Sequence, residues 1–101
     1  MDVVWSSRAT EANHTIYRYL SQYDERIASR VVDRIRETGD RLGVVVTGRP
    51  GRIPGPREKP VSGQPYILLY VRQTRSGREY ILILDVVHMS RNWPRGRLPP
   101  L

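Results

Sequence analysis

Apolar residues recur at every third or fourth position in two successive stretches of the N-terminal half. The first stripe contains Ala9, Ala12, Ile16, Tyr19, Leu20 and Tyr23, and the second contains Ile27, Ala28, Val31, Val32, Ile35 and Leu42. This spacing predicts two amphipathic helices, because an α-helix brings such positions to one face. Ser6 or Ser7 is expected to cap the first helix and Asp24 the second, and Gly43 is a natural stop. The short joint between the helices indicates an antiparallel helical hairpin.

The C-terminal half changes to a pattern that is typical of β-strands. Residues 66–71 and 80–84 form two apolar runs rich in aromatic and β-branched side chains. The segment Arg75-Ser76-Gly77-Arg78 lies between them. A connection of this kind, which contains glycine, predicts a β-hairpin.

A basic loop joins the two halves. Residues 48–57 contain three glycines and three prolines, which exclude a helix. Residues 57–61 are expected to form a short strand, and this strand should lie at an edge or contain an irregularity because Pro60 cannot donate to a ladder. With residues 3–5 as a first strand, the order is β-α-α-β-β-β. The chain is therefore expected to adopt an α+β fold, in which the helical hairpin covers one face of a small antiparallel sheet.

Length and composition set further limits. Residues 1–94 are expected to form a single domain, and residues 95–101 a flexible tail rich in Pro and Arg. The chain has no cysteine, no recognisable signal peptide and no apolar run near the roughly 20 residues of a membrane span, so a cytoplasmic location without membrane contact is expected.

The net charge of +7 comes entirely from the second half. Residues 1–48 carry seven arginines and seven acidic residues, whereas residues 49–101 carry nine arginines and Lys59 against three acidic residues. This half is expected to present a basic face to phosphates or to an acidic protein. The alternative is a solvated surface in a protein that prefers arginine, since the chain has sixteen arginines and one lysine.

Candidate chemistry is concentrated in His88-x-x-Arg91-x-Trp93. Cleavage of RNA by a 2′-hydroxyl requires a base, an acid and cations for the charge that develops on phosphorus, and His88 can act as an acid or base near neutral pH. The alternative is that His88 ends a strand and hydrogen-bonds a backbone group or a tyrosine. Trp93 either packs against the sheet or anchors an interface. A metal site is not expected, because His14 has no second ligand four residues later.

A set of short motifs is spread along the chain in a fixed order. They are Val4-Trp5 with Ala9, Ile16-Tyr17-Arg18-Tyr19, Gly48-Arg49-Pro50-Gly51, Arg57-Glu58-x-x-Val61, Pro65-Tyr66-Ile67-x-x-Tyr70 and Ile83-Leu84-x-Val86-x-His88-x-x-Arg91-x-Trp93-Pro94. Over roughly residues 3–94 this order resembles the RelE/ParE superfamily of bacterial type II toxins. The resemblance implies a cognate antitoxin that forms a hetero-oligomer with the chain. We expect the segment of the antitoxin that binds the toxin to be acidic.

The superfamily has two branches with different targets. RelE-like members resemble ribosome-dependent mRNA endoribonucleases and place an arginine at the position of Ile67, whereas ParE-like members are associated with poisoning of DNA gyrase. The motifs around Tyr66 and His88 resemble the ParE-like branch. Asp85 departs from that branch, which commonly has a basic residue there, and is expected to bring negative charge to the functional face.

The resemblance therefore implies a gyrase inhibitor that acts by binding, without catalytic residues, cofactor or metal. The residues expected to bind the target are Arg57, His88, Arg91 and Trp93, with nucleic acid contacted indirectly. The alternative is an mRNA endoribonuclease that uses His88, Arg91, Arg57 and Tyr80.

Overall fold

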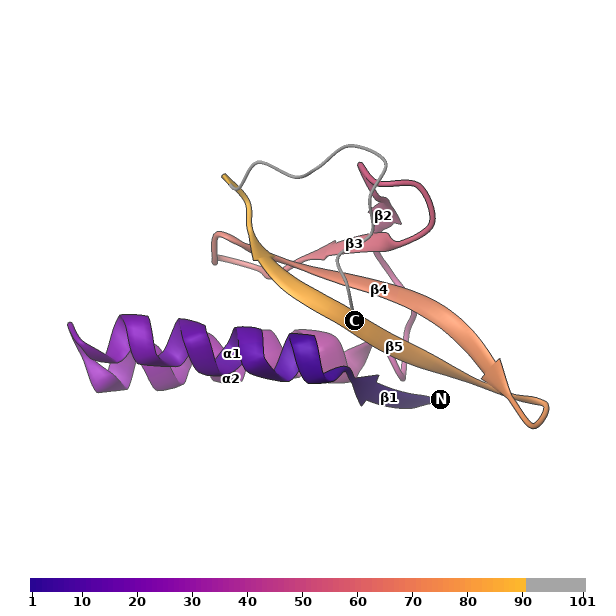
Figure 1. The fold of residues 1–101 in the computed structure, drawn as a ribbon, viewed down its shortest axis with the longest axis horizontal. Coiled ribbons are helices and arrows are strands. Elements are labelled where there is room, and N and C mark those ends of the chain that lie inside the picture. The colour runs from indigo at the N-terminus through magenta and orange to yellow at the C-terminus, as the bar shows by residue number, and fades with distance from the viewer. Residues whose placement is uncertain (91–101) are drawn as a thin grey trace.

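The computed structural model describes residues 1–90, which form two helices and a five-stranded sheet (Figure 1). The elements are β1 (Asp2–Trp5), α1 (Ser7–Ser21), α2 (Glu25–Arg41), β2 (Arg49–Pro50), β3 (Arg57–Pro60), β4 (Tyr66–Arg75) and β5 (Arg78–His88). The helices lie side by side along one face of the sheet (Figure 1). The α+β class is confirmed, and the expected tail at 95–101 lies outside the described residues.

The sheet has the strand order β1-β5-β4-β3-β2, and it is mixed. β1 pairs in parallel with β5, with Asp2 opposite Tyr80, and the other neighbours are antiparallel. The expectation of a purely antiparallel sheet is therefore corrected at β1. Apolar alternation identifies a strand but does not fix its direction, which depends on where the helical hairpin returns the chain.

The basic loop contains a strand that the sequence did not reveal. Arg49 and Pro50 form β2, which pairs with only two residues of β3. The amide of Val61 donates to the carbonyl of Tyr66 on β4. Backbone hydrogen-bonding groups point to alternate sides along a strand, so the position at which Pro60 lacks an N–H faces away from β4. β2 pairs only with Arg57 and Glu58, so it does not reach Pro60 and needs no hydrogen bond from it. The expected edge position of this proline is confirmed.

Both predicted helix caps are present. The Ser6 side chain accepts from the amide of Ala9, and the Asp24 side chain accepts from the amides of Arg26 and Ile27. The predicted β-hairpin is also present, because Ser76 and Gly77 join β4 to β5 with positive φ values of 52° and 76°. A type I′ turn requires this geometry at both central residues.

The main core lies between the helices and the sheet. It includes Ala9, Val31, Ile35, Leu42, Leu68, Tyr70, Ile81, Ile83 and Val86. A second apolar cluster, Ile67, Leu69, Leu84 and Val87, occupies the opposite face of the sheet. The predicted helical stripes are wrong at Tyr19, Tyr23 and Ile27, which are exposed. The helical hairpin extends beyond the end of the sheet, so part of its apolar face has no strand to pack against (Figure 1).

β1 is held against the end of α2 by a close aromatic contact. Trp5 donates from Nε1 to Oδ1 of Asp40 over 3.0 Å, and the amino group of Met1 donates to the carbonyl of Gly43 over 2.6 Å. A Cβ added to Gly39 would lie 2.7 Å from Cη2 of Trp5 and closer still to Cζ2. The indole therefore needs a residue without a side chain on α2. Within residues 1–90, neither helix is long and apolar enough to cross a bilayer.

We predict that Gly39→Ala lowers the free energy of unfolding by about 1–2 kcal/mol, because the clash with Trp5 outweighs the higher helix propensity of alanine. Urea denaturation measures this change. Ser29→Ala, at an exposed position of the same helix, is the control and should change stability by no more than about 0.5 kcal/mol. A variant that is more stable than the parent, as propensity alone requires, would contradict the packing argument.

Candidate functional site

His88 ends β5 next to the first residue of β4. It lies opposite Tyr66, and the two rings meet edge to face with centroids 5.4 Å apart. The Nδ1 atom of His88 accepts from the amide of Ser90 over 3.2 Å and lies 2.8 Å from the Ser90 hydroxyl. Nδ1 of the imidazole is thus engaged in a hydrogen bond with the backbone just after the strand.

The other described members of the nuclease alternative lie far from His88. Tyr80 is opposite Gln73 near the hairpin turn. It is eight residues from His88 along β5, or about 26 Å at roughly 3.3 Å per residue. Arg57 lies on β3, two strands away from β5, and donates to the carbonyl of Gly48 over 3.0 Å.

A common reacting atom cannot contact Arg57, Tyr80 and His88, because hydrogen-bond catalysis requires separations near 3 Å. Ile67, at the position where RelE-like chains have an arginine, is fully buried. Arg91 and Trp93 lie outside the described residues. Within residues 1–90, no three His, Asp or Glu side chains gather in a way that could hold a metal ion.

A groove of about 620 Å³ opens beside His88, between α1 and the paired ends of β4 and β5. Its walls include Arg8, Glu11 and Ile16 from α1, together with Tyr66, Asp85 and His88 from the sheet. The groove is therefore partly apolar and partly charged, and it brings His88 together with α1, which the sequence had not linked to it.

Asp85 is buried beneath this groove, and this position corrects the expectation drawn from the sequence. Its side chain is 5% exposed, and Oδ2 lies 3.1 Å from Nε of Arg8. Its Oδ1 accepts from the amide of Val86 over 2.8 Å. Asp85 does not add an uncompensated negative charge to the surface, because Arg8 on α1 neutralises it. Arg8 was not identified from the sequence, where it is one basic residue among many.

A β-bulge in β5 lies directly before Asp85. The register passes from Leu69 opposite Asp85 to Tyr70 opposite Ile83, so Leu84 is an extra residue in β5. Such an insertion reverses the alternation of side chains beyond it. The Ser6 hydroxyl donates to the carbonyl of Leu84 over 2.9 Å, which ties the bulge to the start of α1.

The basic loop is held by a second buried carboxylate. Glu58 is 2% exposed. Its Oε1 lies 3.3 Å from Nη2 of Arg49, and its Oε2 accepts from Nε and the amide of Arg52 over 3.2 and 2.8 Å. Tyr70 also donates its hydroxyl to the carbonyl of Thr47. The loop next to Arg57 is thus fixed in position by contacts that composition alone did not reveal.

The pKa of Glu58 reflects two opposing effects. Burial on its own raises the pKa of this carboxyl. Hydrogen bonds from Arg52, the charge of Arg52 and a hydrogen bond from Arg49 outweigh burial and hold the pKa below the ordinary value of 4.5. The folded state therefore favours the ionised carboxylate, and the two arginines stay bound to it at neutral pH.

We predict that Arg8→Ala lowers the free energy of unfolding by about 1–3 kcal/mol, because it leaves the buried carboxylate of Asp85 without its cation. Asp85→Asn in the same background should recover part of this loss, since it removes the unpaired charge. Arg18→Ala is the matched control on α1, because Arg18 pairs with Glu11 while both side chains are about two-thirds exposed. Equal losses for Arg8→Ala and Arg18→Ala in urea denaturation would exclude a stabilising role for the buried pair.

We predict that Glu58→Gln destabilises the fold by about 1–3 kcal/mol at neutral pH and by progressively less in acid. The contribution of Glu58 is complete above the pKa of the unfolded chain, and it is lost as the pH falls through the lower pKa of the folded chain. Unfolding free energies of both proteins across acidic pH measure this convergence. Glu79→Gln, which breaks an exposed pair with Arg72, is the control. A difference that is independent of pH would refute the assignment.

Comparisons with known proteins agree with this architecture. A protein of Sinorhizobium fredii (strain NBRC 101917 / NGR234) described as "Putative toxin Y4kP" is 37% identical over 92 residues, which cover 90% of this chain and 91% of that protein. A solved structure described as "Chromosomal ParDE TA system from P. aeruginosa" superposes with a TM-score of 0.78 at 23% identity. The match covers 89% of this chain and 97% of that chain, and at this identity it supports the fold.

Residues 3–93 match the family described as "ParE toxin of type II toxin-antitoxin system, parDE". This range includes every strand and helix from Val3 onward, the bulged strand β5 and His88. A toxin of such a system has an antitoxin as its partner. The chain belongs to the ParE toxin family of type II toxin-antitoxin systems.

Proposed function

We propose that this ParE-family toxin acts in the cytoplasm by binding DNA gyrase and inhibiting it, and that its antitoxin neutralises it. The observation that carries the proposal is the separation of Arg57, Tyr80 and His88, three residues that a nuclease mechanism would need together. A binding inhibitor does not require such a centre. It requires a rigid surface with complementary shape and charge.

Two parts of the described surface can serve as this binding face. One is the groove beside His88, where an apolar wall and fixed charges lie together. The other is the basic loop, where Arg57 lies next to the arginines that Glu58 holds in place. Each site uses a buried carboxylate to fix arginine side chains, which lowers the entropic cost of ordering them in a complex. Arg91 and Trp93 extend the same proposal beyond the described residues.

We predict that the purified chain inhibits supercoiling of relaxed plasmid by gyrase and leaves mRNA intact on translating ribosomes. His88→Ala and Arg57→Ala should each raise the concentration for half-inhibition by about tenfold, the usual effect of truncating an interface anchor. Gel assays of plasmid topology and of mRNA integrity, run in parallel, measure both activities. Gln73→Ala, at an exposed position near the hairpin turn, should behave as the parent.

Cleavage of mRNA at defined codon positions that disappears in His88→Ala would replace this proposal with the endoribonuclease alternative. If His88→Ala and Arg57→Ala both inhibit gyrase as well as the parent does, gyrase remains the target but the proposed binding face is wrong.

A further inference from the structure

The tip of the helical hairpin exposes apolar side chains that no element of the sheet covers. Both helices extend beyond the end of the sheet (Figure 1). Tyr23 lies in the joint between the helices, and Tyr19 and Ile27 lie near the helix ends that flank this joint. Tyr19, Tyr23 and Ile27 are 57%, 74% and 49% exposed. The rings of Tyr19 and Tyr23 meet edge to face with centroids 5.6 Å apart, so the two side chains form one contiguous surface. Large exposed apolar residues that cluster in this way are typical of contact surfaces.

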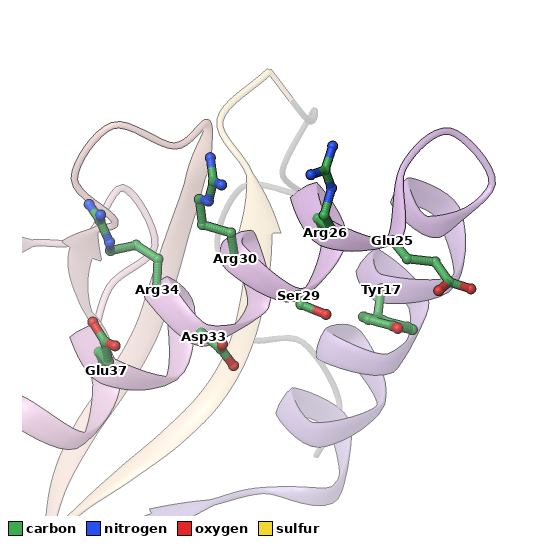
Figure 2. Close-up of a pocket in the computed structure, with 8 residues that line it drawn as sticks. All are labelled: Tyr17, Glu25, Arg26, Ser29, Arg30, Asp33, Arg34 and Glu37. Carbon is green, nitrogen blue, oxygen red and sulfur yellow. The ribbon is translucent and has the colours of Figure 1, made fainter.

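A row of arginines runs along α2 from this tip. Figure 2 shows Arg26, Arg30 and Arg34 leaving the same side of the helix, while Ser29 and Asp33 leave another side. The three arginines follow i, i+4, i+8 spacing, which places neighbours about 6 Å apart along the axis. Like charges at this spacing destabilise an isolated helix. The row therefore does not serve the stability of α2 itself.

The arginines are only weakly engaged within the described residues. Arg26 is 90% exposed at its side chain and lies 3.9 Å from Asp24. Arg34 donates to the carbonyl of Ser62 over 3.2 Å. Arg30 makes no ion pair with any residue of the range 1–90. The row thus presents cationic groups at the surface.

The apolar patch and the arginine row adjoin each other. Ile27, Arg30 and Arg34 follow i, i+3, i+7 spacing, and these positions lie on one side of an α-helix. Tyr23 precedes α2 directly before its capping residue, Asp24. The combined surface is an apolar patch with a cationic border along one side.

The chemistry of this surface selects among possible occupants. A nucleic acid would gain from the arginines, but it would gain nothing from the exposed aliphatic side chain of Ile27. A second copy of this chain would bring its own arginine row to the contact. An amphipathic helix with carboxylates at i, i+4, i+8 matches the row, and its apolar face can cover the tyrosines and Ile27.

We propose that the hairpin tip and the arginine row of α2 form a docking surface for an acidic amphipathic helix of a partner protein. This inference does not depend on gyrase as the target, because it rests only on the surface of α1 and α2. Association should be salt-sensitive, since the charged border is exposed and therefore screened.

Fluorescence anisotropy of the full chain with two labelled synthetic helices tests the proposal. One peptide carries glutamates at i, i+4, i+8 beside a leucine ridge, and the matched peptide carries glutamines at those positions. At low salt the glutamate peptide should bind about tenfold more tightly, and this preference should disappear at high salt. Arg26→Gln combined with Arg30→Gln should abolish the preference for the glutamate peptide. Tyr23→Ala should weaken the binding of both peptides.

The matched control is Arg75→Gln combined with Arg78→Gln, which removes the same charge at the distant turn between β4 and β5. All substituted side chains are exposed, so thermal melts should match the parent. The proposal is overturned if both double variants lose the preference equally, or if the two peptides bind alike. Tighter binding of a DNA duplex that depends on Arg26 and Arg30, or self-association that depends on them, would also overturn it.

Discussion

A single extra residue in β5 decides which side chains of the last strand face the helices. Before the bulge, Ile81 and Ile83 enter the main core, and after it Val86 does so. If the alternation of Ile81 and Ile83 continued through Leu84 without a bulge, Val86 would point to the opposite face of the sheet, and the core beneath α1 would lose one of its apolar contacts. The bulge also lies beside the pair of Asp85 with Arg8, and the carbonyl of its extra residue, Leu84, accepts from Ser6, the capping residue of α1. Helix start, strand register and groove are thus coupled at one irregular position.

Local chemistry predicted much of the fold. Ser6, Asp24 and the Ser76-Gly77 turn were identified because each satisfies a backbone requirement within a few residues of itself. The parallel pairing of β1 was not predicted, because it depends on residues almost eighty positions apart. The exposure of Tyr23 and Ile27 was missed for a related reason. Helical periodicity shows that a face is apolar, but it does not show where the sheet that covers it ends.

The candidate site was predictable in part. His88 was singled out and does line a groove, whereas Asp85 was expected to bring negative charge to the functional face and is instead buried and paired with Arg8. The burial of Asp85 depends on its pairing with Arg8, which lies on another element and 77 positions away in the sequence. Glu58 shows the same limit, because its role depends on two arginines in a loop that forms around it. In both cases a buried carboxylate fixes arginines, an arrangement suited to recognition more than to bond cleavage.

The pairing of β1 with β5 has a consequence for synthesis on the ribosome. Translation produces β1 first and β5 last among the strands of the described chain, so the first strand must remain without its partner until all the others have been made. Contacts between such distant segments form late, because the loop between them must close before they gain any stability. A nascent toxin therefore cannot complete its sheet early. Until the last strand emerges, Trp5 and Gly39 can meet, but the edge of β1 that later joins β5 stays open to other chains.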